Sequence, residues 1–103
     1  MIELKNDNYD KTVSSTPILV VDFWAPWCGP CKALTPLLEE IEPRFSKFAT
    51  FAKVNVDDCM EIATAENIRA VPTVLFFKDG RKVDTLVGLA EKSVFIDKIK
   101  NLI

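Results

Sequence analysis

The stretch Ile18–Trp24 constrains the fold of this chain more than any other segment. Every residue in it is aliphatic or aromatic except Asp22. A strand with one face in water alternates apolar and polar side chains. A stretch that is apolar on both faces therefore indicates a central strand, of the kind found in parallel sheets with helices on both sides. The sequence thus predicts an α/β architecture built around this strand.

Further apolar stretches predict four more strands, and apolar residues at helical spacing predict four helices. Pro36 lies inside the longest helix, so we expect a kink there, and Pro43 weakens the prediction of its last turn. Asp79-Gly80 is typical of a hairpin turn between the last two strands. The other expected strands are Ile2–Leu4, Phe51–Val56, Val71–Phe77 and Lys82–Val87. The expected helices run from a cap at Asn6 or Asp7 to Ser14, from Cys31 to Phe45, from a cap at Asp57 or Asp58 to Asn67, and over Glu91–Leu102, with Val94, Phe95, Ile99 and Leu102 inward.

The order of these segments, β-α-β-α-β-α-β-β-α, implies a mixed five-stranded sheet with four helices on its two faces. A chain of 103 residues has the size of one domain, so we expect residues 1–103 to form a single domain. Its 49% apolar and 27% charged residues are typical of globular proteins and exclude the disordered and fibrous classes.

Charge and composition also exclude several classes of function. A net charge of −2, without a long run of like charges, argues against nucleic-acid binding. The chain has no histidine, which removes imidazole acid–base chemistry and histidine-containing metal sites. The apolar stretches are too short to span a bilayer, and the first residues are charged where a signal peptide would be apolar. We therefore expect a cytoplasmic protein that has no membrane partner.

The motif Cys28-Gly29-Pro30-Cys31 lies between the central strand and the longest helix. Residues three apart on a helical turn have Cβ atoms about 5–6 Å apart, so the two sulfurs can form and break a disulfide with little backbone movement. Free N–H groups and the helix dipole at the start of the helix favour the thiolate of the first cysteine. We therefore expect Cys28 to attack disulfides and Cys31 to resolve the mixed disulfide.

Two other interpretations of the cysteines stay open at this point. A C-x-x-C pair is also half of a zinc site, but Cys59 would add only a third thiolate where zinc usually takes four ligands. The spacing of two core cysteines could also be coincidental. Cys59 itself is either a small, partly buried residue without a role or a site of regulatory oxidation or of an intermolecular disulfide.

Several single residues near this motif are anomalous for their predicted elements. Asp22 has apolar neighbours, which should raise its pKa, unless it lies at a frayed strand end. Lys53 lies in an apolar strand, where it either pairs with a buried charge or extends its ammonium to the surface. We expect Trp27 to be exposed, because Trp24 already fills the inward position. Pro72 opens a strand, where a trans proline is the default.

The stretch Trp24-Ala25-Pro26-Trp27-Cys28-Gly29-Pro30-Cys31-Lys32 closely resembles the active-site signature of the thioredoxin family. The resemblance extends over the whole chain and implies a thioredoxin fold. Two positions depart from the common pattern: Pro26 stands where an acidic residue is frequent, and Ala70 where many relatives have glycine. The other matching positions are Asp22, Pro36, Lys53, Pro72-Thr73, Asp79-Gly80 and Gly88.

The resemblance implies a role for each residue of the site. Cys28 is the nucleophile and Cys31 the resolving thiol. Asp22 is the buried carboxylate that assists proton transfer at Cys31, and Lys53 is its partner. Pro72 is implied to be a cis proline that faces the disulfide. The implied substrate-binding residues are Trp27, Gly29, Pro30, Val71, Pro72 and Gly88.

The activity implied by the resemblance is general protein-disulfide reduction by a monomer that binds no cofactor and no metal. Electrons come from NADPH through a flavoprotein thioredoxin reductase, and the other partners are disulfide-containing proteins. Two alternatives remain. An oxidant or isomerase of the same fold would usually place histidine between its cysteines, where this chain has Gly29-Pro30. A binding module would use the groove to dock a partner, with the redox state incidental.

Overall fold

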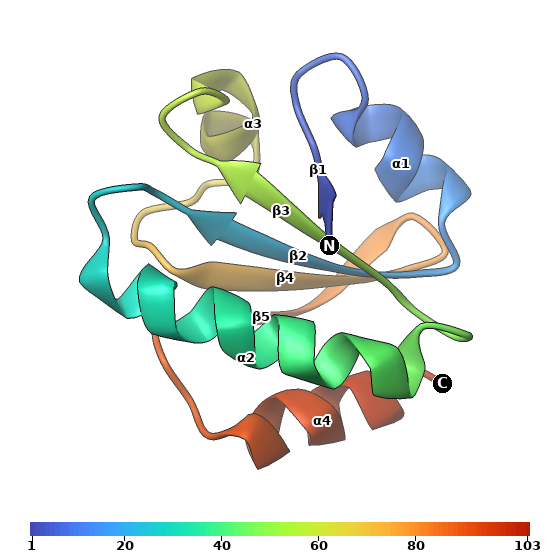
Figure 1. Ribbon diagram of the computed structural model, residues 1–103. Coiled ribbons are helices and arrows are strands. Elements are labelled where there is room, and N and C mark those ends of the chain that lie inside the picture. Colours follow the sequence, from blue (N-terminus) through green and yellow to red (C-terminus); the bar gives the residue numbers. More distant parts are fainter.

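A five-stranded mixed sheet forms the centre of the computed structural model, which describes residues 1–103 (Figure 1). The strand order is β1-β3-β2-β4-β5, with β1, β3 and β2 parallel and with β4 and β5 antiparallel to their neighbours. The helices α2 and α4 lie on one face of the sheet, and α1 and α3 lie on the other. The elements are β1 (Ile2–Glu3), α1 (Tyr9–Ser15), β2 (Ile18–Trp24), α2 (Gly29–Phe45), β3 (Thr50–Asn55), α3 (Met60–Ala65), β4 (Thr73–Lys78), β5 (Arg81–Val87) and α4 (Lys92–Lys100).

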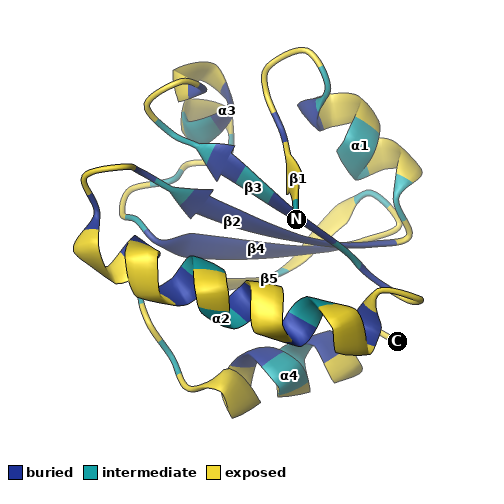
Figure 2. Ribbon diagram, in the orientation of Figure 1, coloured by how far each residue is buried: buried dark blue, intermediate teal, exposed yellow.

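The predicted central strand is confirmed, with β2 between β3 and β4. Six of its seven residues are buried, and only Trp24 at its end is half-buried. Side chains of a strand alternate between faces, so Val20 contributes to the core under α2 and α4, whereas Val21 and Phe23 contribute to the core under α1 and α3. Figure 2 shows that β2 and β4 are mostly buried, whereas β3 alternates between buried and partly buried residues.

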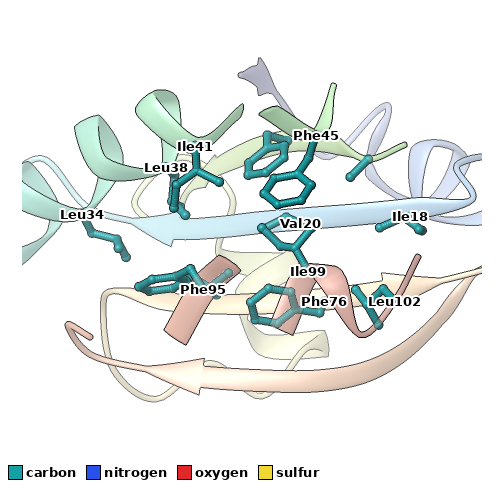
Figure 3. Packing of buried hydrophobic residues seen from close by; sticks show 13 residues of the cluster. Ile18, Val20, Leu34, Leu38, Ile41, Phe45, Phe76, Phe95, Ile99 and Leu102 are labelled. Atoms are coloured by element: carbon teal, nitrogen blue, oxygen red, sulfur yellow. The ribbon is translucent and has the colours of Figure 1, made fainter. Parts of the chain in front are cut away.

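The larger core lies between the sheet and the helices α2 and α4 (Figure 3). Leu34, Leu38, Ile41 and Phe45 recur at helical spacing along α2, and all four are buried. The opposite stripe of α2 is exposed, as the alternating colours of Figure 2 show. Phe95 of α4 is fully buried in the same core. Burial of these apolar stripes is what holds the two helices on the sheet.

The second core lies under α1 and α3. Tyr9 of α1 packs edge-on against Phe23, with ring centroids 6.2 Å apart. Its hydroxyl donates a hydrogen bond of 2.5 Å to Glu66, directly after α3. This bond links the two helices across the sheet face, and burial together with Glu66 raises the pKa of Tyr9 above its usual range.

All four helices are found, but their ends differ from the predicted ones, most clearly in α2 and α3. The longest helix begins at Gly29 and continues through Pro36 and Pro43 to Phe45. Pro36 has no N–H to donate to the carbonyl four residues earlier. Because Pro36 lies on the exposed side of α2, solvent can reach that carbonyl instead. The third helix is shorter than predicted, because Asn67 adopts a left-handed φ of 61° that ends the helical backbone.

The hairpin between β4 and β5 is confirmed. Asp79 and Gly80 both have positive φ, 52° and 82°, as a two-residue turn of this type requires. β4 begins at Thr73 rather than Val71, because Pro72 has no N–H to give to a sheet ladder. A register shift between Phe76 and Phe77 bends the pairing of β4 with the edge strand β5. None of the four helices has the length and apolar composition needed to cross a bilayer.

Two neighbouring residues of α4 test how the core is stabilised. Phe95→Ala should lower the free energy of unfolding by about 3–5 kcal/mol, because it removes a fully buried ring and leaves a cavity. Val94, which precedes it, is 38% exposed, contrary to an inward position expected from helical spacing. Val94→Ala is the matched control and should change the stability by no more than about 0.5 kcal/mol. Equal losses in chemical denaturation would contradict this assignment of the core.

Candidate active site

The C-x-x-C pair lies where β2 ends and α2 begins, and the two cysteines form a disulfide. Their Cα atoms are 5.3 Å apart, within the range that a disulfide requires. Cys28 is the N-cap of α2, and its Sγ accepts a hydrogen bond of 3.1 Å from the N–H of Cys31. Pro30 lies in the first helical turn, where its fixed φ suits a helix start. The expected strand–turn–helix setting of the motif is confirmed.

The surroundings of the pair are largely apolar and bury both cysteines. Cys28 and Cys31 are 4% and 2% exposed, so in the disulfide state the attacking and the resolving cysteine do not differ in burial. Trp27 is 70% exposed, as expected, and its Nε1 donates a hydrogen bond of 3.2 Å to Asp57. This bond fixes the indole beside the disulfide.

Asp22 is fully buried on the face of β2 that α2 covers, which excludes a frayed strand end. Its Oδ2 accepts a hydrogen bond of 2.7 Å from the Thr35 hydroxyl, and its Oδ1 has no hydrogen-bond partner in the protein. Burial raises the pKa of Asp22 to about 6, while the Thr35 hydroxyl and, to a smaller extent, the Lys53 charge oppose this increase. A carboxyl group with such a pKa can take up and release a proton close to neutral pH.

Lys53 lies directly across from Asp22 in the register of β2 and β3. Its ammonium lies 5.6 Å from the centre of the Trp24 ring and forms no ion pair with the carboxylate. The charge of Lys53 therefore lowers the pKa of Asp22 over a distance, by electrostatic attraction and without direct contact. The structure thus places the two residues of the implied pair together but does not join them.

Of the implied groove residues, Val71 packs against the small cluster that contains both cysteines, and Pro72 follows it in the chain. The Val71–Pro72 peptide bond is cis, as the resemblance implied, and the Pro72 carbonyl accepts a hydrogen bond of 2.8 Å from the N–H of Gly88. Gly88 has a φ of 85°, which favours glycine, and an added Cβ would meet open space. Gly29 is exposed and equally uncrowded.

Two shallow pockets flank the site. The first, of about 190 Å³, is mostly apolar; Trp27 and Val71 line it, together with Ala70, one of the two positions that depart from the family pattern. The second, of about 280 Å³, lies on the side of α2 and includes Cys31, Thr35 and Lys53 in its wall. One pocket thus offers an apolar surface beside the disulfide, and the other gives access to the second cysteine.

Cys59 lies outside this site. It precedes α3, is buried, and its thiol donates a weak hydrogen bond of 3.8 Å to the carbonyl of Leu4. Burial raises the pKa of its thiol, which disfavours the reactive thiolate. No group of three or more Cys, Asp or Glu side chains is placed to hold a metal ion.

Comparison with known proteins decides the family. The family model described as Thioredoxin matches residues 1–101. The chain belongs to the thioredoxin family. The resemblance drawn from the sequence is confirmed, and so is the predicted thioredoxin fold: a solved structure of Plasmodium falciparum thioredoxin superposes with a TM-score of 0.90, at 36% identity and over 98% of each chain.

Similar sequences come from chloroplasts and from bacteria. The chain is 45% identical over 87 residues to the chloroplastic M-type thioredoxin of Spinacia oleracea, covering 84% of this chain and 48% of that protein. It is 44% identical over 86 residues to thioredoxin 1 of Synechococcus elongatus, covering 84% of this chain and 79% of that one. The chain thus spans about half the length of the spinach thioredoxin and most of the cyanobacterial one.

Sequence reasoning did not single out Thr35, the residue that contacts Asp22. The signal was available in the helical period, because Thr35 follows Cys31 by four positions and therefore lies on the same side of α2. What the sequence could not supply was the orientation of that side toward β2.

The pKa of Asp22 predicts how stability depends on pH. The folded-state pKa of about 6 lies above the ordinary value of 3.8, so the folded state binds the proton more tightly than the unfolded state. Asp22 therefore lowers the free energy of unfolding as the pH rises from about 4 to about 6. A difference of about two pKa units, at about 1.4 kcal/mol each, amounts to about 3 kcal/mol.

Asp22→Asn should remove this pH-dependent decrease in the free energy of unfolding. Denaturation of the oxidised protein at pH 4 and at pH 7 should give a smaller stability difference for the variant than for the unchanged chain. Asp7→Asn, at an exposed aspartate whose side chain forms no hydrogen bond or ion pair, serves as a control for the loss of one charge. Parallel pH profiles for the Asp22 variant and the unchanged chain would show that Asp22 does not titrate in this range.

Proposed function

We propose that the protein is a general protein-disulfide reductase that passes electrons from its Cys28–Cys31 dithiol to disulfides in other proteins. The observation that carries the proposal is the position of the cysteine pair. The two cysteines close a disulfide at the first turn of a 17-residue helix, in a chain of the thioredoxin family. That position provides the N–H groups and the dipole that favour a thiolate.

The first step is attack by the Cys28 thiolate on one sulfur of the substrate disulfide. A new bond forms between Cys28 Sγ and that sulfur, the substrate S–S bond breaks, and the second substrate sulfur leaves as a thiolate. The N–H of Cys31, which points at Cys28 Sγ in the oxidised state, is a donor that would also stabilise the attacking anion.

The second step is resolution by Cys31. Its thiol loses a proton, and its sulfur attacks Cys28 Sγ. The Cys28–Cys31 disulfide forms, the bond between Cys28 Sγ and the first substrate sulfur breaks, and that sulfur leaves as a thiolate, so that two electrons have passed to the substrate. Asp22 is the proposed proton acceptor for Cys31, and a pKa of about 6 suits that role at neutral pH. Lys53 would favour the ionised carboxylate through its charge.

The substrate is proposed to bind along Trp27, Val71, Pro72 and Gly88, with Gly29 and Pro30 at the edge of the contact. The exposed Trp27 indole offers an apolar contact surface beside the disulfide. The uncrowded surface at Gly88 supports close approach of another backbone. We propose that an extended segment around the substrate disulfide binds along this surface.

The electron supply completes the proposal. We propose that a flavoprotein thioredoxin reductase returns the disulfide to the dithiol with electrons from NADPH, and that the chain itself binds no cofactor. It acts as a monomer of one domain, residues 1–103, without nucleic-acid or membrane partners. A cytoplasmic location fits these partners, because that compartment keeps dithiols reduced.

Two cysteine variants test the order of the steps. Cys28→Ser should abolish the reduction of insulin, because no nucleophile remains at the helix start. Cys31→Ser should still attack but should accumulate Cys28 mixed disulfides, which non-reducing gels and mass spectrometry would detect. Cys59→Ser is the matched control and should reduce insulin at the rate of the unchanged chain. Normal turnover by the Cys28 variant would refute the assignment of the nucleophile.

The reduction potential separates a reductase from an oxidant. Equilibration of the Cys28–Cys31 couple against dithiothreitol and glutathione buffers should give a potential more reducing than that of glutathione. A value well on the oxidising side would assign the chain to the oxidants and isomerases of this fold. The absence of a two-electron couple would leave docking of a partner as the better account.

A further inference from the structure

Thr35 makes an unusual contact for a threonine in the middle of a helix. Such hydroxyls commonly donate to the carbonyl four residues earlier, and Thr12 of α1 does so, with a bond of 2.8 Å to the carbonyl of Asn8. The Thr35 hydroxyl instead leaves its own helix and donates to Oδ2 of Asp22 at 2.7 Å. No other protein group hydrogen-bonds this fully buried carboxylate.

Thr35 also contacts the pocket beside the resolving cysteine. Cys31, Thr35 and Lys53 line this pocket of about 280 Å³, whereas Asp22 does not reach its wall. Thr35 therefore contacts the carboxylate on one side and the open pocket on the other. Any movement of Asp22 toward or away from the pocket must change the Thr35 hydrogen bond.

We propose that Thr35 is a positioning residue, whose hydroxyl holds Oδ2 of Asp22 so that the unpaired Oδ1 takes the proton from Cys31 during resolution. This inference rests on the proposed reductase function. The hydrogen bond occupies one carboxylate oxygen in a fixed orientation. The other oxygen, which has no protein partner, is left as the proton acceptor.

The remaining groups around Asp22 do not supply this hydrogen bond. β3 contributes the Lys53 charge without contact, and β4 places the apolar Val74 opposite Asp22. Lys32 and Glu39 of α2 line the pocket at its exposed side. Burial raises the pKa of Asp22, and the Thr35 hydrogen bond is the larger of the two effects that oppose it. Loss of the hydroxyl should therefore raise this pKa further.

The first measurement is a carbon-13 NMR titration of the Asp22 carboxyl group in the reduced protein. Thr35→Val keeps the shape of the side chain and removes the donor, so the titration midpoint should rise by about one to two pH units. Thr35→Ser restores a hydroxyl and should return the midpoint toward that of the unchanged chain. Thr64→Val, at an exposed position of α3 on the other face of the sheet, should leave it unchanged.

The second measurement follows resolution itself. Reaction of the dithiol with Ellman's reagent forms a mixed disulfide, and attack by Cys31 then releases a second coloured thiolate that stopped-flow absorbance detects. In Thr35→Val the midpoint of the pH–rate profile should rise by the amount seen in the titration. In the Asp22→Asn background the same change should have no further effect, because the group it positions is absent.

The outcomes separate the two proposals. An unchanged chain that cannot reduce insulin would overturn the reductase function and, with it, the proton step. An active chain in which Thr35→Val leaves both midpoints unchanged would overturn only the role of Thr35. A Thr35→Val effect that persists unchanged with Asn at position 22 would show that Thr35 acts on the helix or on Cys31, and would equally overturn its role at Asp22.

Discussion

The burial of β2 on both faces is the constraint on which the rest of the structure depends. A strand with no face in water needs helices on both sides, and it is α2, entering directly after β2, that covers the face carrying Val20 and Asp22. The helix start and the end of the strand are thereby forced together, which places Cys28 at an N-terminus with free donors. The same burial disfavours the ionised form of Asp22 and raises its pKa, so that the carboxyl group can act as a base near neutral pH.

The residues alone predicted much of this architecture, because its strongest signals are local. Ile18–Trp24 indicated a central strand and Asp79-Gly80 a hairpin turn, and both follow from rules about neighbouring residues. The end of α3 did not follow, because only the backbone shows that Asn67 adopts a left-handed conformation. The helical period places Val94 on the same side as Phe95, but neighbouring positions on a helix point in different directions, and Val94 lies at the exposed border of that side.

The features of the site also fall into those that the sequence shows and those that only the structure shows. The spacing of Cys28 and Cys31 and the anomaly of Asp22 are visible in the sequence, whereas the cis bond before Pro72 was expected only from the family resemblance. The contact between Thr35 and Asp22 depends on how α2 is rotated on the sheet. That rotation is set by buried leucines on the same helix, and no local pattern reports it.

The edge strand β5 has a consequence for how the protein behaves in crowded solution. One side of β5 presents unpaired backbone groups, and such an open edge can recruit a strand from another copy. The register shift beside Phe76 and Phe77 twists this edge, and Arg81 and Lys82 place two positive charges at its start. A second copy approaching in parallel register would bring these like charges together, and in either register it would meet the twisted edge, so both features disfavour the addition of a further strand to β5.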